Sequence, residues 1–179
     1  MAVRYALARK KAVDLLSFAK IEAPPIDVER LAFLVGASIK MAPFQGKLSG
    51  MVQRHPDGTA VIGVNSCDSE TRKRFTIAHE IGHLLLHADK NFHIDESFPV
   101  YLRNERSSTA QDEREVEANQ FAAELLMPSR MLMRDVESNK THIDFENGAG
   151  DDLIVKLAKQ YNVSVTALTF RLANLNLLR

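Results

Sequence analysis

Apolar positions recur at helical spacing near the start of the chain. Residues 2–20 predict a first helix, with Val13 and Leu16 on its apolar stripe. A Pro-Pro break follows, and a second helix is predicted between Asp27, which can cap its start, and Gly36, which ends it. The beginning of the chain therefore predicts two helices separated by a turn.

Three short runs then alternate in the manner of strands: SIKMAPF, SGMVQRH and TAVIGVN. The last two flank Pro56-Asp57-Gly58, a sequence typical of a hairpin turn. From about residue 88 to 112 no period is sustained, and an irregular loop is predicted there. This part of the chain therefore predicts a small sheet followed by a loop.

The remaining chain is helical in pattern. A helix is predicted from Glu113 to Met127, where Pro128 stops it, and Ser129 can cap a shorter helix. After a polar linker, residues 151–162 and 164–175 predict two closing helices. The elements together predict an α+β fold that is mostly helical, with a small antiparallel or mixed β-sheet.

Composition and charge narrow the class of protein. The chain has 179 residues, 45% of them hydrophobic and 26% charged, which are values of a globular protein. Its 23 basic and 23 acidic residues balance, so nothing in the overall charge favours nucleic acid or an anionic membrane. Cys67 is the single cysteine, and neither a secretory signal nor an apolar run of membrane length is evident. We expect a cytoplasmic protein of one domain.

The stretch RFTIAHEIGHLLLH contains His79, Glu80 and His83 in an H-E-x-x-H pattern. Residues four apart on a helix return to nearly the same face, roughly 6 Å further on, so both imidazoles can bind one ion. Glu80 lies about 100° round the helix, within reach of a water held there. His87 is eight residues from His79, roughly 12 Å of rise, which is too far for one ion. We expect His87 at the helix end or as a hydrogen-bond partner of a ligand.

A second interpretation explains the histidines without metal. They and Arg72 and Thr76 can form the solvated side of an amphipathic helix, and the motif alone does not decide between the two. Gly82 favours the metal site slightly, because glycine inside a helix costs about 1 kcal/mol against alanine. Such a glycine suits a position that a strand or a substrate approaches closely.

A third ligand has to come from another segment, and DEREVEANQFAAELLMP is the best source. On a helical wheel Glu113, Glu117, Gln120 and Glu124 form the solvated face, whereas Glu115 falls among the core residues. A carboxylate is costly to bury unless it is paired or binds a metal, so Glu115 is the predicted ligand and Glu117 the substitute. Asn119, on the same side, can hydrogen-bond a ligand histidine.

Two histidines, a glutamate and an open position are typical of catalytic zinc, although manganese also suits these ligands. Water activated by the ion would lose its proton to Glu80 and attack a peptide carbonyl. Four further side chains are candidates for stabilising the oxyanion and cannot be ranked: His93, Tyr101, Arg103 and His142.

RFTIAHEIGHLLLH followed by EVEANQFAAELLMP resembles the ImmA/IrrE family of bacterial metallopeptidases, and the similarity extends over most of residues 20–175. The resemblance implies metal ligands at His79, His83 and Glu115 and a catalytic Glu80. It also implies a zincin-like fold, here divided into an N-terminal helix (1–20), a catalytic core (21–137) and a C-terminal helical pair (150–179).

The resemblance further implies the substrate, a helix-turn-helix transcriptional repressor whose cleavage relieves repression after a stress signal. Members are often encoded beside that repressor, in phages, integrative elements or toxin–antitoxin-like pairs. No direct contact with nucleic acid or membrane is expected.

Two other functions remain open from the sequence. Residues 151–175 have the helix, turn and helix of a DNA-binding motif, so the protein could be a regulator, although few cations lie on the second helix. A degenerate member of the family could bind metal and a partner without cutting, against which the intact Glu80 argues.

Overall fold

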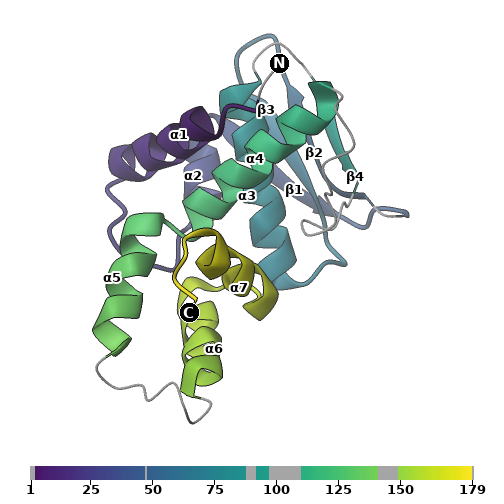
Figure 1. Cartoon of the computed structure of the whole chain (residues 1–179). Helices are drawn as coiled ribbons and strands as arrows, with labels where there is room; N and C mark the ends of the chain where they lie inside the picture. Colours follow the sequence, from purple (N-terminus) through teal and green to yellow (C-terminus); the bar gives the residue numbers. More distant parts are fainter. Residues whose placement is uncertain (1–2, 47, 88–91, 97–109, 141–148, 179) are drawn as a thin grey trace.

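The computed structural model describes residues 3–46, 48–87, 92–96, 110–140 and 149–178. Within these ranges seven helices and a four-stranded mixed sheet form the fold (Figure 1), which confirms the mostly helical α+β class. Among the described helices, none combines the length and apolar character that a membrane span requires. In chain order the elements are α1 (Tyr5–Phe18), α2 (Val28–Leu34), β1 (Ala37–Ala42), β2 (Leu48–Arg54), β3 (Ala60–Asn65), α3 (Glu70–Leu86), β4 (Phe92–Glu96), α4 (Ala110–Leu126), α5 (Ser129–Lys140), α6 (Ala149–Tyr161) and α7 (Val165–Asn174).

The sheet has the strand order β1-β3-β2-β4. Strands β2 and β3 form the predicted antiparallel hairpin, with Gly58 at a φ of 86° in its turn, and β1 pairs with β3 in parallel. Strand β4 pairs antiparallel with β2 and lies where the sequence predicted an irregular loop. The prediction failed there because five residues of mixed polarity carry no clear period, and the pairing depends on the distant edge of β2.

Helix α1 is shorter than predicted and presents a different face to the core. Leu16 is buried as predicted, but Val13 is 46% exposed, so its assignment to the buried stripe was wrong. The other buried positions of this face are Ala8, Ala12, Leu15 and Ala19. Alanines on this face let α1 pack closely against α4.

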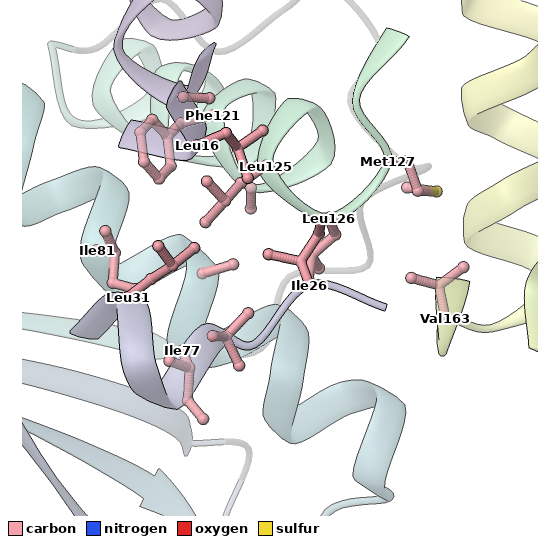
Figure 2. Close-up of a cluster of buried hydrophobic side chains, with 14 of the residues drawn as sticks. Leu16, Ile26, Leu31, Ile77, Ile81, Phe121, Leu125, Leu126, Met127 and Val163 are labelled. Atoms are coloured by element: carbon pink, nitrogen blue, oxygen red, sulfur yellow. The ribbon is translucent and has the colours of Figure 1, made fainter. Parts of the chain in front are cut away.

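The core forms where α3 is enclosed between the sheet and α4. Figure 2 shows Ile77 and Ile81 of α3 facing Phe121 and Leu125 of α4, with Leu31 of α2 beside them. Each of these side chains is at most 1% exposed. Full burial of such a side chain contributes about 1.5–3 kcal/mol, so this contact fixes how α3 and α4 face each other.

Helix α4 is also held by two arginines from distant helices. Arg171 of α7 is ion-paired with Glu124 and donates from Nε to the Met127 carbonyl at 3.1 Å. Arg4, at the start of α1, binds Glu117. The sequence placed both glutamates on a solvated face, and this was wrong, because they are only 2% and 3% exposed. A helical wheel cannot show that arginines from elsewhere in the chain pair with them.

Candidate metal centre

Helix α3 presents the motif residues to the protein interior. Its N-terminus is capped by Ser69, whose side chain accepts a hydrogen bond from the Arg72 amide. His79, Glu80 and His83 are each at most 4% exposed. The interpretation of these histidines as the solvated side of an amphipathic helix is therefore wrong, because the sheet and α4 cover the helix on two sides.

The motif histidines and Glu115 bring three donor atoms together. Nε2 of His79 lies 2.9 Å from Nε2 of His83 and 3.2 Å from Oε2 of Glu115, and Nε2 of His83 lies 3.4 Å from Oε1 of Glu115. Atoms bound to zinc at about 2.0–2.2 Å in a tetrahedron are about 3.3 Å apart. Among the described residues these three are the one such cluster of potential ligands. The donor set therefore fits a zinc-sized ion with little movement.

Glu115 is held in the ionised state that a ligand requires. Burial opposes ionisation, but hydrogen bonding and charge at His79 and His83 outweigh it, and the pKa of Glu115 lies well below its usual range. The sequence prediction that Glu115 points inward is confirmed, since this residue is 9% exposed.

Each motif histidine has a hydrogen-bond partner on its second ring nitrogen. Nδ1 of His79 lies 3.0 Å from Oδ1 of Asn119, as predicted for this residue. Nδ1 of His83 lies 3.0 Å from Nδ1 of His87, which caps the end of α3. His87 thus lies at the helix end and is also the partner of a candidate ligand, the two roles expected for it. These contacts direct both Nε2 atoms toward Glu115.

Glu117, the substitute ligand, is engaged elsewhere. Its Oε2 lies 3.0 Å from Nε2 of His87 and 2.7 Å from the guanidinium of Arg4. Burial opposes its ionisation, but bonds from Arg4 and His87 prevail and lower the pKa of Glu117 to about 2. Burial also lowers the pKa of His87, although its bond to Glu117 opposes the shift. Glu117 therefore contacts the candidate ligands through His87.

Sequence reasoning missed Gly50, which makes room for the Glu80 carboxylate. A Cβ at Gly50, on β2, would lie 3.1 Å from Oε1 of Glu80 and 2.3 Å from Cγ2 of Thr76. The available signal was a glycine inside a predicted strand, which often marks a close approach. The absent side chain thus allows the strand and the Glu80 helix to lie together.

Gly82 has the same effect on the other side of α3. A Cβ there would lie 3.2 Å from Cα and 3.3 Å from the carbonyl oxygen of Ala118. The expected close approach is real, but the approaching element is helix α4 and not a strand or a substrate. Gly82 and Ala118 together bring Glu115 within reach of the two histidines.

A cavity of about 340 Å³ opens beside this cluster, between α3, α4 and α7. Its lining includes Phe75, whose ring centroid is 6.2 Å from that of His79, and Asn119, the His79 partner. Apolar side chains form much of the remaining wall: Ala123, Val163 and Phe170. The oxyanion candidates cannot be placed around it, since Tyr101, Arg103, His142 and the side chain of His93 lie outside the described residues.

Comparison with known proteins relates the chain to a protein family, to a phage protein and to a solved structure. Residues 35–173 match the profile of the peptidase M78 family, described as the IrrE N-terminal-like domain. Over 94 residues the chain is 37% identical to "Uncharacterized immunity region protein 2" of Bacillus phage phi105, an alignment that covers 51% of this chain and 54% of the phage protein. A "Mycobacterium tuberculosis transcriptional regulator" has a similar structure, with a TM-score of 0.58 at 18% identity over 93% of this chain and 46% of that one. The similarity to the mycobacterial protein concerns the fold alone. The chain covers only about half the length of the phage protein and of the mycobacterial protein.

Proposed function

The chain belongs to the peptidase M78 family of IrrE N-terminal-like domains, and from this we propose that it is a metal-dependent endopeptidase that cleaves a helix-turn-helix transcriptional repressor. The convergence of His79, His83 and Glu115, with buried Glu80 beside the first histidine, carries the proposal. A divalent ion at this cluster, zinc or manganese, would supply an activated water and polarise a peptide carbonyl.

The chain's own residues then have distinct tasks. His79 and His83 bind through Nε2, because Asn119 and His87 occupy their Nδ1 atoms. Glu115 contributes a negative charge, which reduces the net charge of the loaded site. Glu80 accepts a proton on its carboxylate and returns it to the leaving amine nitrogen. The cavity next to Phe75 and Asn119 gives a side chain of the substrate space beside the reacting bond.

The class of substrate rests on the resemblance to ImmA/IrrE peptidases and on the phage relative. That relative is named for an immunity region and is 37% identical over the aligned half. Regulation by cleavage of a repressor is consistent with such a location. The repressor, like a cytoplasmic site of action, is therefore part of the proposal.

The alternative is a helix-turn-helix regulator in which α6 and α7 bind DNA. The described structure argues against it. The cationic residue of α7 is Arg171, which is 4% exposed and paired with Glu124. Leu168 and Leu172 of α7 are also buried. A recognition helix needs cations and polar side chains on its free face, and α7 has an apolar Phe170 there, 45% exposed.

The test is incubation of the zinc-loaded protein with the helix-turn-helix repressor encoded beside its gene. We expect two fragments and a single new N-terminus, identified by mass spectrometry. Glu80→Gln keeps the three ligands and should lower the rate by about 10²–10⁴-fold. Glu70→Gln is the matched control, because Glu70 is an exposed carboxylate on the same helix, and it should cut like wild type.

Two results would contradict the proposal. A Glu80→Gln protein that cuts as fast as wild type would remove Glu80 from the mechanism. Wild-type protein that binds the repressor, or its operator DNA, and leaves the repressor intact would favour a regulator. Metal content separates the classes independently, since the peptidase requires a stoichiometric ion that is lost in His83→Ala.

A further inference from the structure

The two candidate histidine ligands differ in what supports them. Nδ1 of His79 lies against a neutral amide, that of Asn119. His83 is supported by a chain of three side chains that continues through His87 and Glu117 to Arg4, 113 residues from Glu117 in sequence. This series of side chains ends at Arg4, the residue that immediately precedes α1, whose guanidinium also lies 3.5 Å from the Leu86 carbonyl at the end of α3.

The position of every proton in this chain follows from the role of His83. To bind a metal through Nε2, His83 must carry its proton on Nδ1 and donate it to Nδ1 of His87. His87 must then carry its own proton on Nε2 and donate it to Oε2 of Glu117. Glu117 has to remain a carboxylate in order to accept it. One set of tautomers satisfies all three residues.

Arg4 holds Glu117 in the orientation that this arrangement needs. Its Nε lies 3.0 Å from Oε1 and its terminal nitrogen 2.7 Å from Oε2, in a bidentate geometry. The backbone amide of Arg4 donates to Oε1 as well, at 2.8 Å. Glu117 is 3% exposed, so its charge depends on this partner. The Arg4 side chain is 50% exposed, so a binding partner can reach this end of the hydrogen-bonded series.

We propose that His87 and Glu117 are positioning residues for the metal ligand His83, and that Arg4 couples the start of helix α1 to the affinity of the metal centre. This inference rests on the proposed metal site, because it assigns Nε2 of His83 to the ion. Its functional meaning is that displacement of the first turn of α1, by a partner or by proteolysis, weakens metal binding without touching a ligand.

Helix α4 offers a matched control. Glu124 is also a buried carboxylate on α4, 2% exposed, and is also paired with an arginine from a distant helix, Arg171. Within the described ranges it has no histidine partner and instead accepts bonds from Ser129. Glu117→Gln and Glu124→Gln therefore remove equivalent charges from the same helix, but only the first lies behind a ligand.

The experiment measures zinc affinity by competition with a chromophoric chelator, and the visible spectrum of the cobalt-loaded protein. Glu117→Gln and His87→Ala should each weaken zinc binding by about 10–100-fold and shift the cobalt spectrum. Glu124→Gln should leave affinity and spectrum at wild-type values, even where thermal unfolding shows that it is destabilised. Arg4→Met should weaken zinc binding by a smaller factor.

The outcomes separate this inference from the proposed function. If the wild-type protein binds neither zinc nor cobalt, both are overturned. If wild type binds zinc and Glu117→Gln binds it equally well, or if Glu124→Gln weakens it as much, only the positioning role is overturned. An Arg4→Met protein with wild-type affinity would overturn the coupling to α1.

Linkage provides a second readout that needs no metal-site substitution. If Arg4 strengthens metal binding, metal must equally strengthen the docking of Arg4. Hydrogen exchange of the Arg4 amide, which is bonded to Glu117, should therefore slow when zinc is added. The amide of Ala167, capped by Ser164 at the start of α7, should exchange at an unchanged rate. Equal slowing at both amides would contradict a specific link.

Discussion

Replacing Gly50 by alanine would place a methyl group inside the packing between strand β2 and helix α3. The new carbon would lie 2.3 Å from Cγ2 of Thr76, whereas carbon atoms in contact are about 3.5–4.0 Å apart. Thr76 is fully buried and β-branched, so it cannot turn away freely. Overpacking of this kind costs about 1–3 kcal/mol, and removing a glycine from a strand returns about 0.5–1 kcal/mol. Because the 2.3 Å contact is far inside van der Waals distance, the cost lies at the upper end of that range, and we expect a net loss of about 2 kcal/mol. A loss of this size lowers the Tm by about 4–8 °C in a chain of this length.

The cause of this loss can be isolated with Thr76→Ser, which removes the methyl group that the new carbon would meet. Alone, Thr76→Ser should cost about 1 kcal/mol for the lost buried methyl. Combined with Gly50→Ala, the two changes exchange one methyl for another in nearly the same space. The double variant should therefore be within about 1 kcal/mol of wild type, a coupling of about 2 kcal/mol.

The assay is urea unfolding of metal-free protein, with chelator present so that metal affinity does not contribute to the measured free energy. Gly63→Ala, on neighbouring strand β3, is the control, because its methyl would meet the flexible side chain of Met51 at 2.9 Å and the edge of the half-buried Phe44 ring at 3.2 Å. It should cost less than about 1 kcal/mol. The reasoning would be refuted if the stability loss of the double variant equalled the sum of the two single losses to within about 0.5 kcal/mol. Equal losses for Gly50→Ala and Gly63→Ala would also refute it.

Three further predictions concern the site and its support. Gly82→Ala should push α3 and α4 apart by a few tenths of an ångström and thereby lower zinc affinity through Glu115. The free energy of unfolding should change less than the free energy of zinc binding, because alanine returns about 1 kcal/mol of helix propensity. Zinc at 100 times its Kd should add about 2.7 kcal/mol of apparent stability, seen as a higher Tm that a chelator reverses and that His83→Ala lacks. Tyr161→Phe should cost about 1–2 kcal/mol, because the hydroxyl donates to Oδ2 of Asp135 at 2.8 Å. Burial and this bond raise the pKa of Tyr161, so the unfolded chain ionises first, and the stability difference should narrow as unfolding is followed above about pH 10.

Local pattern was sufficient for part of the site. Helical spacing placed His79 and His83 on one face, and the position of Glu115 among core residues led to the third donor. Both inferences depend on residues close in sequence, for which helix geometry is decisive. The hairpin of β2 and β3 was predictable for the same reason.

The failures share a different cause. Glu117 and Glu124 were placed in solvent because the arginines that pair with them come from helices elsewhere in the chain. Gly50 was passed over because its importance lies in the Thr76 and Glu80 side chains opposite it, which no period within its own strand reveals. Burial of a polar residue is decided by its partners, and these are set by tertiary packing.

The two arginine–glutamate pairs on α4 have a consequence for the order of folding. They join residues 113 and 47 positions apart, so each closes a long loop at an entropic cost of roughly 3–4 kcal/mol. Such contacts form late, because the chain between them must first be ordered. Helix α4 carries Glu115, and its arginine pairs with α1 and α7 add to the core contact that it makes with α3. During synthesis we therefore expect Glu115 to reach its final, stable position only after α7 has left the ribosome.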